Sequence, residues 1–277
     1  MRSTRLVLML LVGLMVPSIA IAQDVKIGLL PRLPEKELLV MFTPLAQYLE
    51  KETGRKVSLV IPKDFSTFTQ QAIAGEFHLG FANPNIYIVI KKESPEAEPL
   101  GLASEPGVGT KLQGVFFVVK ESPIKNLQDL KGKKVCFVDQ GSAAGYIAQM
   151  LELQKAGIKQ SDIQIIFAGK PPKVGEMVRD GAADAGGMPA SVYARLPFEF
   201  MLRTIGKTAD LPNWPFFTTK TADKAMASQF KEALLKLKPK TAQADRVLSL
   251  ANLEGFVPTT DADFQVMREA AKAAGIF

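Results

Sequence analysis

The segment GEFHLGFANPNIY, residues 75–87, is matched later in the chain by GAADAGGMPASVY, residues 181–193. Three residues of each copy fall in register: Gly75, Gly80 and Tyr87 in the first, and Gly181, Gly186 and Tyr193 in the second. Each copy follows a helical pattern and turns through a proline into a new helix. The repeat predicts one α/β unit that occurs twice, in two similar lobes facing a shared cleft. The alternative is chance similarity, because Gly and Pro punctuate most loops.

The first 22 residues have the composition of a secretory signal. Arg2 and Arg5 precede an apolar run over 6–16, and Ala20-Ile21-Ala22 forms a small-residue cleavage site. The run is too short for a good membrane span, which argues against the alternative of an uncleaved anchor. No cysteine follows the cleavage site, so a lipid anchor is not expected. We therefore expect an exported, periplasmic protein.

Composition limits the remaining functional classes. Removal of the signal leaves enough chain for one large domain or two of ordinary size. The whole chain has a formal charge of +6 and 47% hydrophobic residues, enough for a substantial core. Its lysines and arginines are scattered, so no nucleic-acid partner is expected, and mild basicity suits an anionic ligand. We expect a monomer.

Catalytic and metal-binding residues are scarce. Cys136 is the single cysteine and lies in an apolar run over 133–138, where a buried, inert thiol is favoured over a nucleophile. His78 is the single histidine, and a polar role at a strand edge is favoured over ligand contact. No cysteine–histidine centre or metal-ligand spacing is present, and no carboxylate pair has motif spacing. We expect no catalytic residue, no metal and no cofactor.

The hydrophobic pattern alternates between strands and helices. The first half predicts strands over 25–30, 56–61 and 79–82, with helices over 35–53, over 65–74 and from Pro84. The middle predicts strands over 113–120, 134–138, 163–167, 183–186 and 200–205, with helices from 142, around 174–178 and from 189. The end predicts helices over 222–237, 242–250 and 260–274. This order favours α/β architecture with parallel or mixed sheets covered by helices.

The chain order also predicts how the lobes are divided. We expect lobe 1 to comprise residues 23–115 and 205–277, and lobe 2 to be inserted between them as residues 116–204. Two chain crossings would then join the lobes and form a hinge.

The longest specific motif is SPIKNLQDLKGKKVCFVDQGSAAGY, residues 122–146. It predicts a short helical turn, a basic turn, a strand and a Gly-Ser loop that opens a helix. Ser142 is an N-cap candidate. The free N–H groups at such a helix start suit an anion.

This motif resembles the phosphate-, phosphite- and phosphonate-binding proteins of ABC importers. IGLLP at 27–31, PLAQYLEKETGRKV at 44–57 and both copies of the repeat contribute to the resemblance. It implies the type II periplasmic-binding-protein fold: two α/β lobes, each a mixed, mostly parallel sheet flanked by helices, with a helical C-terminal tail. It also implies a small anionic ligand and a membrane permease as partner.

The sequence departs from the family pattern at three places. The family's Gly-Ser-Thr-Ser-Gly loop is GSAAG at 141–145 here, so two hydroxyl donors are missing while Ser142 and the backbone amides remain. Lys170 follows Phe167-Ala168-Gly169 where the family often has Ser-His; it supplies either a point charge for an anion or a solvated loop lysine. Leu112 stands where the family often has an aromatic residue.

These considerations give a set of candidate ligand contacts at strand ends and helix starts. The set is Ser142, Ala143, Ala144, Gly145, Asn83, Asn85, Tyr87, Lys170, Met188, Tyr193 and Arg32. Structural alternatives stay open for several of them, since the asparagines could cap a helix, and Tyr87 and Met188 could be core residues.

The function expected is the solute-binding component of an ABC importer that captures phosphate, phosphite or a phosphonate between its lobes and closes by hinge motion. One alternative is a sensory binding protein that feeds a membrane receptor or kinase. A second is a binder of a solute without phosphorus. A third is an exported enzyme on the same fold, which the scarcity of His and Cys disfavours.

Overall fold

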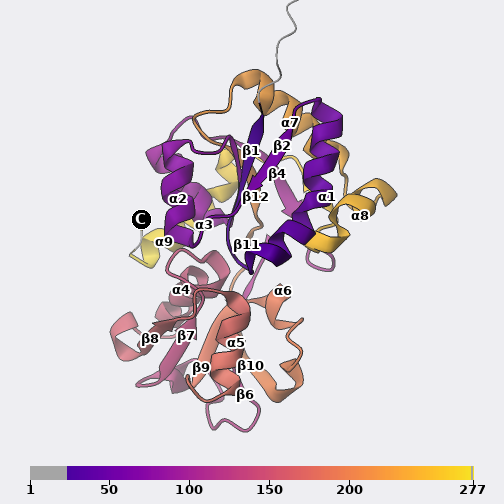
Figure 1. Ribbon diagram of the computed structural model, residues 1–277. Coiled ribbons are helices and arrows are strands. Elements are labelled where there is room, and N and C mark those ends of the chain that lie inside the picture. Colours follow the sequence, from indigo (N-terminus) through magenta and orange to yellow (C-terminus); the bar gives the residue numbers. More distant parts are fainter. Residues whose placement is uncertain (1–23, 276) are drawn as a thin grey trace, which may run out of the picture.

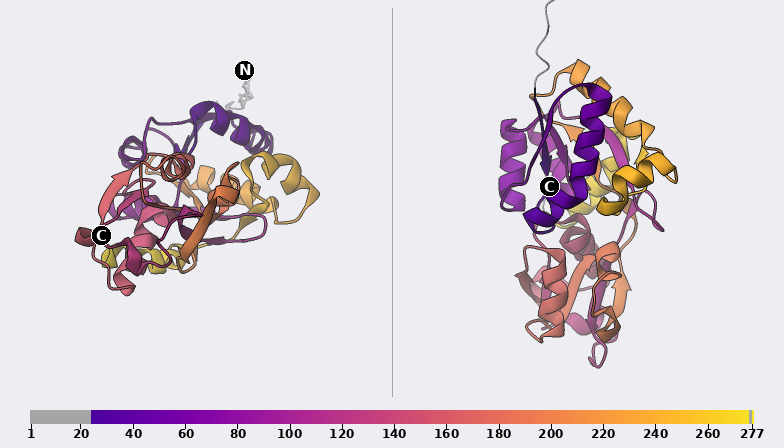
Figure 2. Two further views of the ribbon diagram at one scale, coloured as in Figure 1. Left: turned by 90° about the horizontal axis from the view of Figure 1, so that it is seen from below. Right: turned by 45° about the vertical axis from the view of Figure 1, so that its right-hand side comes forward.

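The computed structural model describes residues 24–275 and 277. The predicted signal peptide, residues 1–22, lies outside the described residues. Figure 1 shows two lobes, one built from both ends of the described chain and the other from its middle. The right-hand view of Figure 2 shows the same two lobes stacked one above the other. No helix among the described residues combines the length and apolar character needed to cross a membrane.

Lobe 1 is organised around a six-stranded sheet with the order β13-β4-β12-β3-β1-β2. Its strands are β1 (Val25–Leu29), β2 (Val57–Val60), β3 (Leu79–Phe81), β4 (Pro99–Ser104), β12 (Pro215–Thr218) and β13 (Gly255–Val257). Strand β1 pairs in parallel with β2 and β3, whereas β12 is antiparallel to β3 and β4. Strand β13 is antiparallel to β4. The carboxyl ends of β1, β3 and β4 therefore share one edge of the sheet with the start of β12.

The helices that cover this sheet are α1 (Glu35–Thr53), α2 (Phe65–Ala74), α3 (Pro84–Glu93), α7 (Lys224–Lys236) and α8 (Ala242–Leu248). Helix α9 (Gln265–Ala273) packs against α3 and, in lobe 2, against α4. Local sequence sets their ends. The Asp64 carboxylate accepts the Thr67 N–H and begins α2, and Gly75 ends it with φ 74°. Gly54 ends α1 in the same left-handed conformation.

Lobe 2 is organised around a five-stranded sheet with the order β10-β6-β9-β7-β8. Its strands are β6 (Gly114–Val119), β7 (Lys134–Phe137), β8 (Gln164–Phe167), β9 (Ala185–Pro189) and β10 (Leu202–Lys207). Strand β7 is parallel to β8 and β9, while β6 is antiparallel to β9 and β10. Its helices are α4 (Ala148–Lys155), α5 (Pro171–Arg179) and α6 (Ala190–Tyr193), and a π-helical turn, Ala143–Ile147, precedes α4.

The chain crosses between the lobes at a two-stranded ribbon. Strand β5 (Lys111–Leu112) pairs with β11 (Leu211–Pro212) in antiparallel fashion. The expected hinge and the expected lobe boundaries at 115/116 and 204/205 stay a proposal. The remaining short elements are 3₁₀ helices at Gln128–Leu130, Gln160–Asp162, Glu199–Met201, Ser249–Ala251 and Asp261–Phe264.

The hydrophobic core forms two clusters. One fills the space between the lobe 1 sheet and α1, α7 and α8, where Phe81, Phe216 and Phe256 pack ring against ring. The other runs from lobe 1 into lobe 2 and includes both Tyr87 and Phe137. The predicted two-lobed α/β class is confirmed, and the helical C-terminal end lies on lobe 1.

Candidate ligand-binding cleft

The carboxyl ends of the parallel strands meet between the lobes. A small cavity there is lined by one residue that follows or ends each of six strands: Arg32 after β1, Asn83 after β3, Glu105 after β4, Ser142 after β7, Pro171 after β8 and Pro189 at the end of β9. Phe65, Leu112, Val138, Ser191, Val192 and Trp214 complete the wall. Open α/β sheets bind ligands in crevices outside the carboxyl ends of their strands.

The cavity is compact. Its volume is about 20 Å³, roughly the room that one or two water molecules require. Polar atoms from both lobes face it, while Leu112, Pro171 and Trp214 supply apolar surface. The arrangement therefore suits a small polar solute that is enclosed when the lobes are together.

Arg32 brings the positive charge of the cavity. Its guanidinium carbon lies 5.1 Å from the centroid of the Trp214 ring, a cation–π contact that fixes its plane. Burial lowers the pKa of Arg32, the charge of Glu105 opposes this shift and that of Arg195 adds to it. An arginine side chain nevertheless stays protonated in proteins. The guanidinium donates no hydrogen bond and forms no ion pair with any residue that the structure describes.

Ser142 contributes an unused hydroxyl from lobe 2. The side chain is 6% exposed, and its backbone N–H donates to the Asp139 carbonyl at 3.0 Å. It occupies the N-cap position before the π-helical turn, but its Oγ makes no capping bond and no other hydrogen bond within the described chain. The predicted position of Ser142 at a helix start is therefore confirmed, whereas its side chain is left to face the cavity.

The three residues after Ser142 lie beneath the cavity surface. Ala143, Ala144 and Gly145 are buried in the π-helical turn and are not among the residues that line the cavity. Gly145 permits a close approach, since a Cβ there would collide with Val138. Contact of these three residues with a ligand therefore stays a prediction, since none of them lines the cavity.

Asn83 and Asn85 join the two lobes. The Nδ2 atoms of both residues donate to the Gly141 carbonyl at 3.2 Å, so the start of α3 in lobe 1 holds the Gly-Ser loop of lobe 2 by two hydrogen bonds. The Asn83 Oδ1 also accepts the N–H groups of Asn85 and Ile86 and caps α3. Asn83 therefore caps a helix, as the structural alternative predicted, and it also lines the cavity. The Oδ1 of Asn85 is buried without a hydrogen bond from the described residues.

Tyr87, Met188 and Tyr193 are core residues rather than cavity residues. The Tyr87 hydroxyl donates to Oδ1 of Asp261 at 2.8 Å, and its ring is fully buried in lobe 1. Tyr193 packs against Phe117 with ring centroids 5.1 Å apart, and Met188 is fully buried. The structure does not bring these three candidates to the cavity.

Lys170 lies at the rim of the cleft. It lines a recess of about 310 Å³ together with Lys173 of lobe 2 and with Lys63 and Asp64 of lobe 1. Phe65 separates this recess from the cavity, since it lines both. Lys170 thus adds positive potential at the entrance without facing the small cavity.

Glu105 was missed from the sequence. It is 7% exposed and lines the cavity, and its Oε1 accepts a long hydrogen bond of 3.4 Å from Asn213 Nδ2. The available signal is a glutamate directly before the glycine-rich turn at 106–109, where the Glu105 N–H and carbonyl both bond Gly109. Strand β4, which places it, was not predicted.

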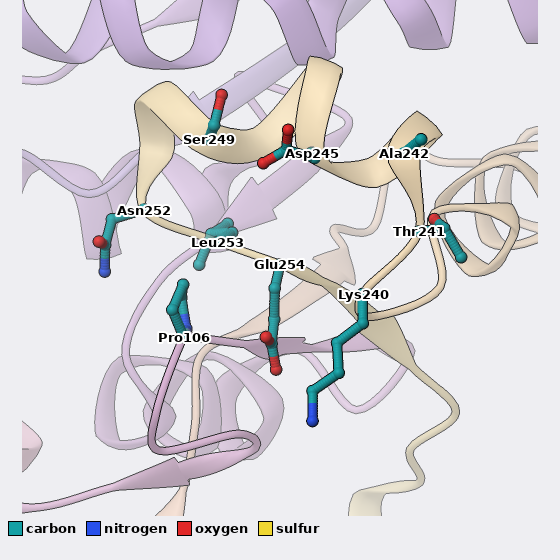
Figure 3. Close-up of a pocket in the computed structure, with 9 residues that line it drawn as sticks. All are labelled: Pro106, Lys240, Thr241, Ala242, Asp245, Ser249, Asn252, Leu253 and Glu254. Carbon is teal, nitrogen blue, oxygen red and sulfur yellow. The ribbon is translucent and has the colours of Figure 1, made fainter.

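Further hollows lie outside the cavity, among them one of about 540 Å³ lined by residues of α2, of α3 and of the loop over 139–141. A recess of about 310 Å³ between the lobes shares Arg32 with the cavity and is lined by Arg195 and mostly apolar residues. A groove of about 410 Å³ lies on lobe 1 and is lined by Lys240, Glu254 and residues of α8. Figure 3 shows the side chains of Lys240 and Glu254 extending in the same direction. No group of three or more metal-ligating side chains is present among the described residues.

Two α/β lobes with a cavity between them, at the carboxyl ends of their parallel strands, are the architecture of a solute-binding protein. Residues 27–264 match the family model for the periplasmic substrate-binding protein of phosphonate ABC transporters. The chain therefore belongs to this family, whose members are transport proteins and not enzymes.

Comparisons with individual proteins agree with this assignment. The phosphate-import protein PhnD of Mycolicibacterium smegmatis is 28% identical, over 91% of this chain and 86% of the relative. The structure of PhnD1 from Prochlorococcus marinus with methylphosphonate superimposes with a TM-score of 0.82 at 17% identity, covering 92% of this chain and 99% of that one. The tetrathionate sensor histidine kinase TtrS of Salmonella typhimurium is 22% identical, over 75% of this chain and 38% of the relative.

Proposed function

We propose that this protein captures a small oxyanion, namely phosphate, phosphite or a small phosphonate, in the cavity between its lobes. It delivers this ligand in the periplasm to the permease of an ABC importer. The observation that carries the proposal is the pairing of Arg32 with Ser142 across the cleft. One supplies an unpaired guanidinium and the other an unused hydroxyl, from opposite lobes of one small cavity.

This pairing couples binding to closure. An anion held by Arg32 of lobe 1 and by Ser142 of lobe 2 makes both contacts only when the lobes are together. A ligand shifts a conformational equilibrium by its differential affinity for the two states. The asparagine bonds to the Gly141 carbonyl stabilise the same closed arrangement.

Isothermal titration calorimetry of the mature protein with phosphite, phosphate and methylphosphonate tests the proposal. Removal of a charge-assisted hydrogen bond costs about 1.5–3 kcal/mol, so Arg32→Ala should weaken binding about 10- to 100-fold. Ser142→Ala removes one hydrogen bond to the charged ligand but no positive charge, and it should weaken binding about tenfold. Absence of binding to all three ligands would contradict the proposal.

Arg55→Ala is the matched control for charge. Arg55 precedes β2, so it lies at the opposite edge of the lobe 1 sheet, where it donates to Gln229. The same loss of one positive charge there should leave the affinity within about twofold, because exposed charges are screened over this distance. Equal losses in the Arg32 and Arg55 variants would assign the effect to net charge rather than to contact.

The comparison with a sensor kinase favours a second candidate. The same cleft could report its ligand to a membrane receptor instead of a permease, as the similarity to TtrS suggests. Uptake of radiolabelled phosphite by cells lacking this gene distinguishes the two. An importer component is required for uptake, whereas a sensor is required only for the transcriptional response to the ligand.

A further inference from the structure

Glu105 is a buried acid without a strong partner. It is 7% exposed at the end of β4, and the bond from Asn213 to its Oε1, at 3.4 Å, is beyond the usual range. Its Oε2 accepts no hydrogen bond, and the carboxylate forms no ion pair, within the described residues. Buried carboxylates are normally paired or fully hydrogen-bonded, so this one requires an explanation.

Arg32, the cation that lines the same cavity, does not form an ion pair with Glu105. Arg32 lines the same cavity, yet no nitrogen of its guanidinium comes within 4.0 Å of a Glu105 oxygen, and it packs on Trp214 instead. The cavity therefore presents an unpaired cation and an unpaired anion that are held apart. A ligand that satisfies both must offer oxygens to Arg32 and a hydrogen to Glu105.

We propose that Glu105 accepts the acidic hydrogen of a protonated phosphorus oxyanion and so excludes sulfur oxyanions. Phosphate, phosphite and phosphonates keep one P–OH hydrogen in mildly acidic solution, since phosphate-type groups lose their last proton around pH 6 or above. Sulfate and sulfonates have the same tetrahedral shape but no such hydrogen. The oxygens of these anions would face the lone pairs of Glu105 without a hydrogen between them. The resulting repulsion between unpaired negative charges disfavours binding of the wrong ligand. This inference rests on the proposed function.

Four ligands at about pH 6 test the inference by calorimetry. Methylphosphonate has a P–OH and no ammonium, aminoethylphosphonate has both, methanesulfonate has neither, and taurine has an ammonium only. The wild-type protein should bind both phosphonates at least 100-fold more tightly than either sulfonate. Binding of aminoethylphosphonate and taurine alone would overturn the inference, because Glu105 would then serve an ammonium group.

Glu105→Gln turns the acceptor into a group that can also donate. The preference for methylphosphonate over methanesulfonate should narrow at least tenfold in this variant, while the bond from Asn213 can persist. Glu254→Gln is the matched control, because Glu254 lies beside the same strand, accepts from Ser104 at 2.9 Å and lines the outer groove of Figure 3. Its selectivity should equal that of the wild type.

The outcomes separate the two proposals. If the wild-type protein binds phosphonates but Glu105→Gln keeps the same selectivity, Glu105 is structural and this inference is wrong while the proposed function stands. If the wild-type protein binds phosphonates and sulfonates equally, this result alone shows that the inference is wrong. If it binds none of the four ligands, the proposed function fails as well.

Discussion

The two copies of the repeated segment place a glycine under a phenylalanine ring in each sheet. In lobe 1, Gly80 of β3 is the cross-strand partner of Phe217 of β12. In lobe 2, Gly186 of β9 is the cross-strand partner of Phe117 of β6. A Cβ at either glycine would collide with the opposing ring. The repeat is therefore a shared packing constraint and not a coincidence of turn residues.

The copies differ where the chain leaves the strand. Asn83 caps the ten-residue helix α3 and bonds across the cleft, whereas Pro189 begins the four-residue helix α6 without a side-chain cap. Both residues line the cavity. The comparison teaches that the shared residues fix the sheet, while the differing residues at the strand ends are those that line the cavity.

The largest expected effect comes from removing the shared glycines. Gly80→Ala and Gly186→Ala should each lower the free energy of unfolding by about 2–3 kcal/mol, the upper part of the range for overpacking a close-packed core. Urea denaturation measures the loss. If one variant is as stable as the wild type, the two lobes do not share this constraint.

Gly101→Ala is the control within the lobe 1 sheet. A Cβ there would meet Phe256 at 3.5 Å, an ordinary contact, so stability should change by less than about 0.5 kcal/mol. The double variant Gly80→Ala, Phe217→Leu gives a further check. Its loss should be smaller than the sum of the two single losses, because the smaller side chain makes room for the methyl group.

Local sequence was sufficient for much of the fold. The predicted helices 35–53 and 65–74 coincide with α1 and α2, because Gly54 and Gly75 end them in the left-handed conformation. Strands β4, β12 and β13 were not predicted. They have three to six residues and are defined by pairing with strands far away in the chain, so local periodicity carries little of their signal.

The site was predictable only in part. Arg32, Asn83 and Ser142 follow strands that the sequence predicted, and all three line the cavity. Tyr87 and Tyr193 occupy equivalent positions in the repeat. Both are equivalent because they pack in the cores of the two lobes, and so their match in sequence did not indicate ligand contact. The position of Glu105 is set by strand β4, which the local sequence pattern did not predict. The acidic residue of the cavity could therefore not be located from the sequence.

The two repeat tyrosines should respond differently to loss of the hydroxyl. Tyr87 donates to Asp261 at 2.8 Å, and Asp261 also accepts from Arg268 at 2.6 Å. The Tyr193 hydroxyl makes no hydrogen bond with the described residues, and burial together with Glu199 raises its pKa to about 12. Tyr87→Phe should therefore cost about 1–2 kcal/mol and Tyr193→Phe close to nothing, as measured by urea denaturation.

A pairwise cycle isolates the Tyr87 bond. Asp261→Asn alone and combined with Tyr87→Phe should show an interaction free energy of about 1 kcal/mol. Tyr193→Phe is the control for ring packing, because the Tyr193 hydroxyl has no hydrogen-bond acceptor among the described residues. Equal losses from Tyr87→Phe and Tyr193→Phe would show that the hydroxyl of Tyr87 contributes no more than its buried surface.

The smallest expected effect concerns the pair His78 and Asp184, which perform the same task in the two copies. His78 Nδ1 accepts the Lys26 N–H at 3.0 Å, and Asp184 Oδ2 accepts the Lys134 N–H at 2.8 Å. Burial, and then the charges of Lys26 and Arg55, lower the pKa of His78, against the opposing charge of Asp223. A protonated imidazole has no acceptor, so the fold favours the neutral form.

The sign of the pH dependence follows from this lowered pKa. The unfolded chain binds the proton more readily than the folded one, so the contribution of His78 is complete above the ordinary imidazole value of about 6.5 and is lost as pH falls through the folded-state pKa. His78→Asp installs the lobe 2 residue and keeps an acceptor whose ordinary pKa is near 3.9. Between pH 7 and 5 the wild type should lose less than about 1 kcal/mol relative to this variant, since His78 is half-buried and its bond is partly screened. Parallel urea curves at both pH values measure the difference, and a variant that follows the wild type throughout would show that His78 and Asp184 are not equivalent acceptors.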